Sequence, residues 1–264
     1  MPTSETQTLT RAVAILDCFN ADHPQLGVRE IARHLEMSRS TVGRLLATLC
    51  SAGVLSQDPA TRRYLMGPKV LTWSAVYTGG GLDIREKARP MLEELHRLTN
   101  ETVNLYVLDG TERVCLEWIE SPQYVRVVVR PGERMPLHAG SAGKAILAFA
   151  PPDLIKQVLA RRLERMTRNT ITNRQKLLKE LACIRACGYA ISRGERFEDA
   201  LGLAAPVFDA SGKVIAALNV AGPNMRFTDT EVDKFAPTIM QLAAQISQAL
   251  GYRAGFPQFN SRSK

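Results

Sequence analysis

The first fifty residues show apolar positions at helical spacing, divided into three short segments. The first segment covers residues 8–20, and Asp22-His23-Pro24 follows it as a helix breaker. A second, shorter helix is expected over residues 28–35. The apolar positions that face one way in these two helices are Leu9, Val13, Leu16, Phe19, Ile31 and Leu35.

A third helix is predicted to begin after Ser38, whose side-chain oxygen can accept a backbone N–H of the first turn. Gly53 is expected as the residue after its end. The buried face of this helix is predicted to hold Val42, Leu45, Leu46 and Leu49. Its first turns expose a different set, namely Arg39, Ser40, Thr41 and Arg44.

Two short β-like segments follow, over residues 54–57 and 64–67, with Asp58-Pro59 between them. Such a pattern predicts a small hairpin, with Arg62 and Arg63 at its tip or on its returning arm. A helix, a tight turn, a polar second helix and a basic hairpin together favour DNA binding, because a helix must enter the major groove while phosphates are held on both sides. An ordinary helical hairpin with solubilising arginines remains the alternative.

The periodicity changes along the rest of the chain. Residues 70–98 are helical in pattern, with an interruption at Gly79-Gly80-Gly81 that we interpret as a hinge between domains. Beyond residue 100 both periods occur, which predicts a mixed α+β domain. Strands are expected at 103–108, 114–120, 124–129, 191–192, 203–209 and 213–220, and helices at 141–150, 153–163, 173–187 and 228–252.

Composition fits a globular protein: 264 residues with 45% hydrophobic and 23% charged residues. No apolar run approaches the roughly 20 residues of a membrane helix, and the first residues lack the pattern of a signal peptide. Five cysteines without a CxxC pair indicate reduced thiols rather than a disulfide framework or structural zinc. We therefore expect a cytoplasmic location and no membrane partner.

The formal net charge of +8 is unevenly distributed. Residues 26–69 contain seven basic and three acidic residues, and six of the seven are arginine, the side chain best suited to phosphates and guanine edges. A second basic run over residues 161–193 has nine basic and two acidic residues. We interpret the second run as a solvated helix face and not as support for DNA binding.

Several motifs, in this order, resemble the IclR-type transcriptional regulators. The winged helix-turn-helix of that family is similar to GVREIARHLEMSRSTVGRLLATL at 27–49 and to GVLSQDPATRRYLMGP at 53–68. Its effector-binding domain is similar to LHAGSAGKAILA at 137–148, GYA at 188–190, AAPVFD at 204–209 and GKVIAALNVAGP at 212–223. The resemblance extends from about residue 9 to residue 252.

The resemblance implies a fold class and partners. It implies an α+β protein with a winged helix-turn-helix over residues 1–70, a linker helix over 71–99, a GAF-like domain with an antiparallel sheet over 100–252 and a flexible tail over 253–264. Family members are homodimers or dimers of dimers that bind a palindromic operator in double-stranded DNA. The residues assigned to DNA contact are Ser38, Arg39, Ser40, Thr41, Arg44, Arg62 and Arg63.

The resemblance also implies a pocket for a small organic effector, acidic or aromatic. Carried over position by position, its candidate residues are Gly140, Ser141, Ala142, Gly202, Asn219 and Ala221. Many members have a cysteine where this chain has Gly202, and serines where it has Asn219 and Ala221. These departures put the usual organic acid in doubt and leave an amide, phenol or carbonyl ligand open. The first turn of the helix expected at Ser141 can attract an anion through its unpaired amides.

Other residues have a structural alternative to a functional role. His138 is interpreted as a hydrogen-bonded structural residue, and Cys183 and Cys187 lack the further ligands that a metal site needs. Trp73 is expected at an interdomain or dimer contact. For Arg126 and Arg130, a solvated strand edge is the alternative to contact with an acidic effector.

The leading hypothesis is a ligand-responsive regulator, a repressor by family frequency, with no cofactor and no metal. The alternatives are an activator of the same family and a ligand-independent DNA-binding protein. An enzyme is disfavoured because neither a Gly-x-Ser-x-Gly elbow nor a phosphate-binding Gly-x-x-x-x-Gly-Lys-Ser/Thr loop is present. The effector, the operator, the sign of regulation and the choice between dimer and tetramer are not determined by the sequence.

Overall fold

The computed structural model describes residues 6–20, 22–79 and 84–253 of the chain, which forms two compact units, Met1–Gly81 and Leu82–Lys264. Two predictions fall largely beyond the described residues: Gly80 and Gly81 of the expected hinge, and residues 254–264 of the expected tail.

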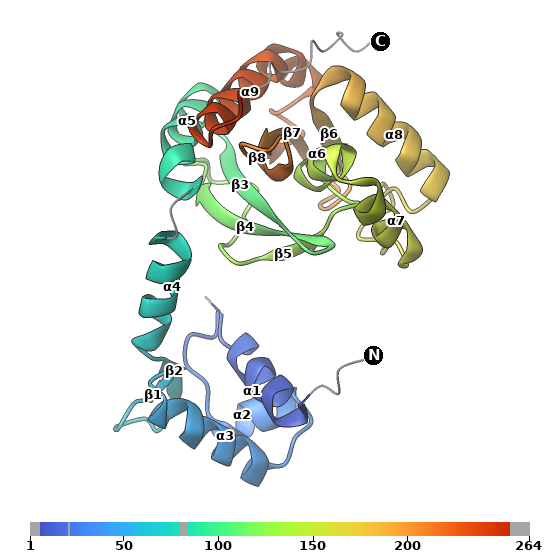
Figure 1. Ribbon diagram of the computed structural model, residues 1–264. Coiled ribbons are helices and arrows are strands. Elements are labelled where there is room, and N and C mark those ends of the chain that lie inside the picture. Colours follow the sequence, from blue (N-terminus) through green and yellow to red (C-terminus); the bar gives the residue numbers. More distant parts are fainter. Residues whose placement is uncertain (1–5, 21, 80–83, 254–264) are drawn as a thin grey trace. The chain divides into compact units, whose positions relative to one another are not determined.

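The first unit contains three helices, a two-stranded sheet and a fourth helix (Figure 1). Apolar side chains of the first three helices and of the first strand form its core, with Ile15, Ile31, Val42, Leu46 and Leu55 almost fully buried. A single bridge from Leu26 to Tyr64 attaches the loop before the second helix to the hairpin. The elements are α1 (Gln7–Asp17), α2 (Val28–His34), α3 (Arg39–Ser51), β1 (Leu55–Gln57), β2 (Tyr64–Met66) and α4 (Lys69–Gly79).

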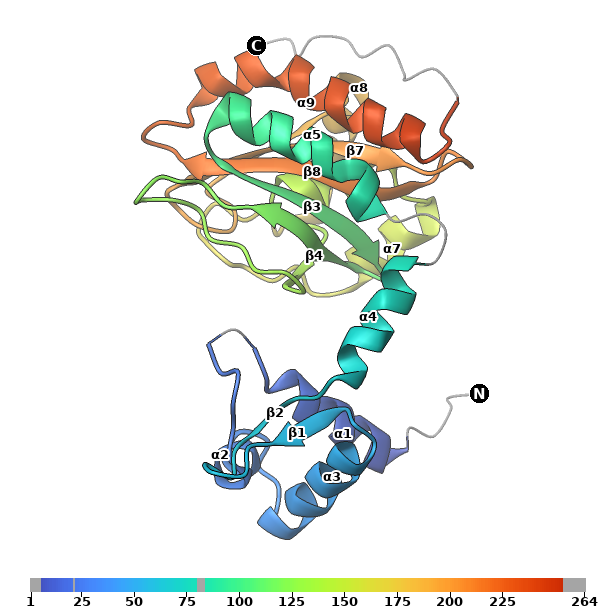
Figure 2. The same ribbon diagram turned by 90° about the vertical axis from the view of Figure 1, so that its left-hand side faces the viewer.

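The second unit is built on a six-stranded antiparallel sheet of order β5-β4-β3-β8-β7-β6. Its central strands are the most buried, because helices cover both faces of the sheet (Figure 2). The strands are β3 (Thr102–Asp109), β4 (Glu112–Ile119), β5 (Arg134–Pro136), β6 (Ala190–Arg193), β7 (Ala200–Phe208) and β8 (Val214–Pro223).

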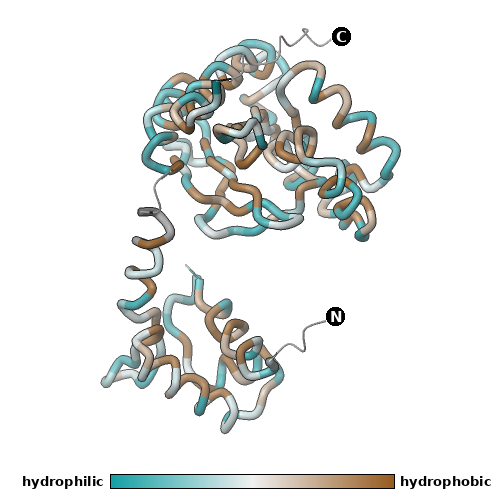
Figure 3. The backbone as a smooth tube through the Cα atoms, in the orientation of Figure 1, coloured by the Kyte–Doolittle hydropathy of each residue, from teal (hydrophilic) through white to brown (hydrophobic). Residues whose placement is uncertain are grey.

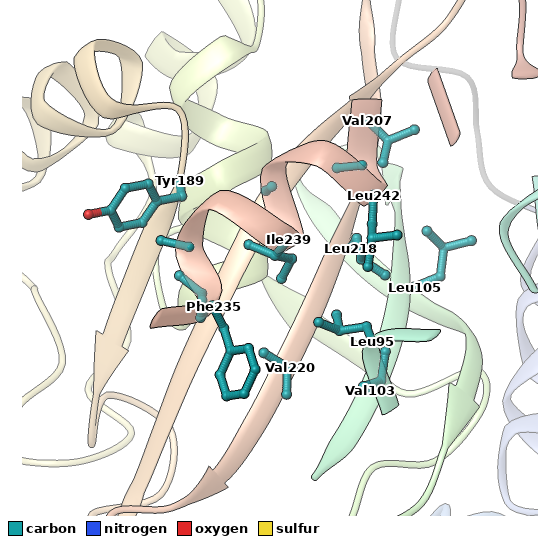
Figure 4. Packing of buried hydrophobic residues seen from close by; sticks show 14 of the residues in the cluster. Leu95, Val103, Leu105, Tyr189, Val207, Leu218, Val220, Phe235, Ile239 and Leu242 are labelled. Atoms are coloured by element: carbon teal, nitrogen blue, oxygen red, sulfur yellow. The ribbon is translucent and has the colours of Figure 1, made fainter. Parts of the chain in front are cut away.

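One face of this sheet packs against α5 (Ile84–Thr99) and α9 (Asp229–Ala249). Figure 4 shows side chains of α9, among them Phe235, Ile239 and Leu242, lying over the strands. Burial of each such aliphatic or aromatic side chain contributes about 1.5–3 kcal/mol. The other face packs against α6 (Ser141–Phe149) and α8 (Arg174–Cys187), and α7 (Pro152–Ala160) lies beside them. The predicted α+β class with an antiparallel sheet is confirmed.

The amphipathic patterns used to predict the helices are visible on the structure. Hydrophobic and hydrophilic residues both occur along α3 and α8 (Figure 3). The buried residues recur at helical spacing, so each helix has one buried and one solvated face. The basic residues of α8 lie on its solvated face, as expected for the second basic run. Gly53 follows α3 with a positive φ of 75°, which confirms it as a helix-ending glycine, and Gly188 ends α8 in the same way with a φ of 83°.

Residues 124–129 are not a strand, contrary to the prediction. Side chains, rather than a neighbouring strand, hold this backbone. Thr102 Oγ1 donates to the Val127 carbonyl at 2.7 Å, and Arg226 Nη2 donates to the Val125 carbonyl at 2.6 Å. The valines of this segment therefore belong to a loop, in which Val127 and Val129 are buried.

The predicted linker, residues 71–99, is divided between the two units. The helix α4 belongs to Met1–Gly81, whereas α5 begins at Ile84 in Leu82–Lys264. Ala88, Leu92 and Leu95 of α5 are fully buried in the core against α9 and the sheet. This helix is thus a structural layer of the second unit.

Candidate functional site

The beginning of α3 is fixed by hydroxyl groups. Ser38 caps the helix, its Oγ accepting the Thr41 backbone N–H at 3.2 Å. The same Oγ lies 3.0 Å from the Ser40 hydroxyl and 2.8 Å from the Thr41 hydroxyl. This set of short polar groups gives the first turn a defined shape, and it presents several donors and acceptors to solvent.

The predicted contact residues on α3 face outward. Ser38, Arg39, Ser40 and Arg44 are exposed and Thr41 is half-buried, whereas Val42 and Leu46 on the opposite face are fully buried. Among the residues that the structure describes, neither Arg39 nor Arg44 has a carboxylate partner, so both guanidinium groups are available to an external anion. The helix α2 packs against α3 from behind and braces it.

The hairpin between β1 and β2 is a wing with an ordered tip. Asp58 Oδ1 accepts the N–H groups of Ala60 and Thr61 at 2.8 and 3.2 Å, and these bonds lower the pKa of Asp58. Arg62 is exposed at this tip and has a positive φ of 59°. Its side chain has no ion-pair partner in the described part of the chain.

Arg63, the neighbouring arginine, is already engaged. Its Nη2 donates to Glu30 Oε2 at 2.8 Å and to the Gln25 carbonyl at 2.9 Å. Glu30 in turn accepts the Gly27 N–H at 2.7 Å. The hydrogen bond from Gly27, followed by that from Arg63, lowers the pKa of Glu30. Arg63 therefore connects the wing to the start of α2, a role that was not predicted from its place in the hairpin.

The second unit contains a cavity on the face of the sheet that also packs against α6. The empty space between the residues that line it is about 430 Å³, a volume that includes its opening to solvent. All six residues predicted for an effector pocket line this cavity: Gly140, Ser141, Ala142, Gly202, Asn219 and Ala221. The three segments predicted to form a pocket thus lie around one cavity in the structure. Their role in binding an effector stays a prediction.

Three of these residues form one interlocked unit. Ser141 Oγ donates to Asn219 Oδ1 at 2.7 Å, and Asn219 Nδ2 donates to Asn104 Oδ1 at 3.2 Å. A Cβ atom on Gly202 would lie 2.5 Å from Ser141 Oγ. The glycine therefore leaves room for the serine hydroxyl that reaches Asn219.

The first turn of α6 is held by a buried ion pair that the sequence did not reveal. Glu195 Oε2 accepts the Gly140 N–H at 3.0 Å, and Glu195 Oε1 pairs with Lys144 Nζ. Lys144 also donates to the Ile191 carbonyl at 2.7 Å and to Glu180 at 3.0 Å. One amide of the anion-attracting helix start is thus satisfied by the protein itself.

Sequence reasoning also missed polar residues of the cavity wall, namely Asn104, Tyr106, Arg113 and Arg196. Asn104 and Arg113 are almost fully buried, and Asn104 Nδ2 and Arg113 Nε have no hydrogen-bond partner in the described part of the chain. An asparagine in the middle of an apolar strand was a usable signal. Arg113 was not singled out, because nothing in the local sequence pattern indicates that this residue is buried.

Burial changes the acidity of two neighbouring groups on this wall. The Arg113 guanidinium lies 5.1 Å from the centre of the Tyr106 ring. Desolvation raises the pKa of Tyr106 to about 12 and lowers the pKa of Arg113 to about 10. At neutral pH the phenol is therefore uncharged and the guanidinium is still protonated.

The remaining candidate residues have structural roles or lie apart from the cavity. His138 is buried, with Nε2 2.9 Å from the Glu164 carbonyl, which fits the structural interpretation. Arg126 pairs with Glu120 on the loop that replaces the predicted strand. Within the described ranges, no three His, Cys, Asp or Glu side chains gather as metal ligands, and no helix has the length and hydrophobicity to cross a bilayer.

Comparison with known proteins assigns both units. The IclR helix-turn-helix domain model matches residues 8–59, and the model of the bacterial transcriptional regulator IclR C-terminal domain matches residues 78–248. The HTH-type transcriptional regulator BhcR of Paracoccus denitrificans is 37% identical over 249 residues, covering 94% of this chain and 88% of that protein. The HTH-type transcriptional repressor AllR of Escherichia coli is 32% identical, covering 94% and 92%.

Solved structures agree with this assignment. The crystal structure of Thermotoga maritima IclR has a TM-score of 0.75 at 31% identity, covering 93% of this chain and 99% of that one. An IclR homologue from Microbacterium hydrocarbonoxydans, crystallised with 4-hydroxybenzoate, has a TM-score of 0.80 at 28% identity, covering 92% and 98%. The resemblance drawn from the motifs is confirmed, and the chain belongs to the IclR family of helix-turn-helix transcriptional regulators.

Proposed function

We propose that this chain is a ligand-responsive repressor whose operator affinity changes when a small organic molecule binds in the cavity of the second unit. The exposed first turn of α3 carries the proposal. Arg39, Ser40 and Arg44 project to solvent from a helix that is braced by α2 and buried on its opposite face. A helix presented in this way suits insertion into the major groove.

Each assigned residue has a distinct part in the proposed complex. Arg39 and Arg44 contact bases or phosphates, since both lack a protein partner in the described part of the chain. Ser38, Ser40 and Thr41 offer hydroxyl groups to the DNA backbone or base edges. Arg62 contacts a flanking phosphate or the minor groove from the wing. Arg63 contributes mainly by holding the wing against Glu30 and only secondarily by direct contact.

The cavity supports the effector half of the proposal. It lies in the family's C-terminal domain, and its wall combines apolar residues with the hydrogen-bonded set Ser141, Asn219 and Asn104. A related protein was crystallised with 4-hydroxybenzoate, which makes that compound a rational first probe. Binding would bias the placement of two winged units in a homodimer, so that operator affinity changes by a coupling free energy.

Fluorescence anisotropy with labelled DNA from upstream of the chain's own gene tests the proposal. The titration is repeated at two salt concentrations, with and without 4-hydroxybenzoate and other small organic molecules. We expect a specific complex whose affinity changes with one ligand. Salt-sensitive binding that no ligand alters would favour the ligand-independent alternative, and no specific binding at all would refute the regulator.

A further inference from the structure

The first unit has a groove where α2 meets the turn before α3, and three arginines line this groove. Arg29 and Arg33 come from α2, and Arg39 is the first residue of α3. All three residues are exposed. Neither arginine of α2 is among the residues predicted to contact DNA. The groove is therefore a feature that the exposed first turn of α3 does not explain.

The positive charge of this groove is not neutralised by the residues around it. Glu30 also lines the groove, but its carboxylate pairs with Arg63 of the wing, so these two charges cancel. Among the residues that the structure describes, Arg29, Arg33 and Arg39 have no ion-pair partner. Three positive charges are thus left facing solvent along one groove.

The placement of these arginines is unfavourable for the fold alone. Arg29 and Arg33 are four residues apart on one helix, so their like charges are neighbours and repel each other. Arg39 lies in the first turn of α3, which contains no acidic residue, and a positive charge there opposes the helix dipole. An external anion in the groove would offset both effects at once.

The position of Arg39 identifies that anion. Arg39 lines the groove and also belongs to the exposed turn of α3. When a recognition helix lies in the major groove, the phosphates of the bound duplex lie at the edge of that groove, where the preceding helix crosses the backbone. The residues between the arginines are small or apolar, since Ala32 is buried and Met37 is half-buried. The groove therefore fits the sugar-phosphate backbone of the duplex that α3 enters.

From these observations we propose that Arg29 and Arg33 bind backbone phosphates of the operator and thereby position α3 in the major groove, with Arg39 completing the contact at the start of α3. The inference rests on the proposed function and adds two positioning residues to it. Guanidinium groups suit this role because their fork of donors matches phosphate oxygens. Contacts to phosphates do not depend on the DNA sequence, so they supply affinity and leave the choice of bases to α3.

Fluorescence anisotropy of the full chain tests the two residues with DNA from upstream of its own gene and with a scrambled duplex, each over a series of salt concentrations. Arg29→Gln and Arg33→Gln should each weaken binding to both duplexes by about tenfold. The logarithm of the association constant falls with the logarithm of the salt concentration, because phosphate contacts release counterions. We expect that slope to become shallower by about 1 in each variant and by about 2 in the double variant.

Neutral methylphosphonates locate the contact on the DNA. Replacing one phosphate at a time in the upstream duplex should reveal at least one position that weakens wild-type binding by about tenfold and leaves the double variant Arg29→Gln with Arg33→Gln unaffected. The other sensitive phosphates should affect both proteins equally. The control is Arg174→Gln, which removes the same charge from an exposed position of the second unit and should keep the wild-type slope and pattern.

A loss of affinity confined to the upstream duplex overturns the proposal, because the two arginines would then contact bases. An unchanged salt slope in both variants also overturns it, as does the same methylphosphonate pattern in wild type and double variant. Melting temperatures measured on the same samples show that each variant is folded.

The failure of this inference and the failure of the proposed function give different results. Wild-type chain that binds its upstream DNA specifically, while both arginine variants bind equally well, would refute the inference and leave the proposed function intact. Wild-type chain that binds both duplexes equally would refute the specific regulator, and the salt slopes would still test the two arginines. A chain that binds neither duplex would refute both.

Discussion

At Gly202 the β7 backbone comes close to the Ser141 hydroxyl. The register pairs Gly202 with Ala221 and Ala204 with Asn219. Asn219, which accepts the hydrogen bond from the Ser141 hydroxyl, therefore lies two residues along β8 from the partner of Gly202. Any side chain at position 202 must displace the Ser141 hydroxyl, whose hydrogen bond to Asn219 would then be lost. The three positions are therefore coupled, and substitutions among them should not be additive.

We expect Gly202→Ala to weaken binding of any ligand that contacts Ser141 or Asn219, and to lower the free energy of unfolding by about 1–3 kcal/mol as an overpacked site. The double variant Gly202→Ala with Ser141→Ala should recover most of that stability, because a Cβ at 202 lies 3.6 Å from the Ser141 Cβ. Urea unfolding followed by circular dichroism measures both. Additive losses would show that the two residues do not compete for one space.

On the exposed face of α3, Arg39→Ala and Arg44→Ala should each weaken operator binding by about 1–3 kcal/mol if the guanidinium contacts bases. Fluorescence anisotropy against the operator and a scrambled duplex checks this. Arg174→Ala is the matched control, since that arginine is exposed on α8 in the second unit. An equal loss on both duplexes would restrict the two residues to phosphate contacts, and no loss would remove α3 from the interface.

Residues whose role depends on the local backbone were predictable from the sequence, whereas residues whose role depends on distant partners were not. Ser38 and Gly53 were correctly placed as the helix cap and the helix-ending glycine, because each acts within a few residues of itself. Arg63 was assigned from its hairpin alone, and Arg113 was not singled out. Their partners are Glu30, 33 residues away, and the carbonyl of Ala139, 26 residues away, and no periodicity reports such pairs.

At the scale of elements, the wing and α2 are joined by the ion pair between Arg63 and Glu30, which depends on the charge of the Glu30 carboxylate. Glu30 accepts from Gly27 and Arg63, and its pKa is lowered in the folded state. A lowered pKa means that the folded state favours the carboxylate. The resulting stabilisation is present above the ordinary glutamate pKa of about 4.3 and is lost as the pH falls through the lower, folded-state value.

We therefore expect Glu30→Gln to lower the melting temperature of the full chain at pH 7. The difference from wild type should shrink as the pH falls below the ordinary glutamate range, because wild type then loses the same contact. Thermal unfolding followed by circular dichroism at a series of pH values measures it. A difference that stays constant across this range would show that the charge of Glu30 contributes nothing.

The helix α6 depends on the buried pair between Lys144 and Glu195. Lys144→Met leaves the Glu195 carboxylate buried without its cation, and we expect a loss of about 3–5 kcal/mol in the free energy of unfolding. Lys144→Met with Glu195→Gln should be less destabilised than Lys144→Met alone, since the amide oxygen still accepts from Gly140. Urea unfolding gives both values. A double variant less stable than the single one would contradict this account of the pair.

Element boundaries show where local patterns mislead. The alternation at residues 124–129 is typical of a strand, but the loop carbonyls are bonded by Thr102 and Arg226, which lie 25 and 101 residues away. The helical pattern of residues 84–99 was correct in type. A helix packed on a sheet and a linker helix have the same periodicity, and only the contacts of α5 with α9 and the sheet show that it belongs to the core of the second unit.

At the scale of the whole molecule, the proposed regulation requires communication between two units that each have their own core. A ligand in the cavity can change DNA affinity only if it binds one arrangement of the assembly more tightly than another. In a homodimer that arrangement includes the partner's winged unit, so the surface that joins two copies is as important to the response as the cavity.

The first unit presents apolar side chains that its own core does not cover. On α4, Leu71 is 73% exposed, Trp73 49% and Val76 72%, and on α1 Leu9 is 66% exposed. Large apolar side chains exposed along one helix favour an interface over solvent, and the contact at Trp73 stays a prediction. We infer that α4 contributes to the proposed homodimer.

Leu71→Glu combined with Val76→Glu should therefore convert the protein to a monomer, as measured by light scattering after size-exclusion chromatography. Operator affinity should fall by more than about tenfold, because the second half-site is then no longer bound intramolecularly. Leu178→Glu, at an exposed leucine of α8, is the control and should change neither property. A variant that remains dimeric would exclude α4 as the interface and require the two winged units to be brought together through the second unit instead. A wild-type chain that is monomeric at micromolar concentration would refute the homodimer itself.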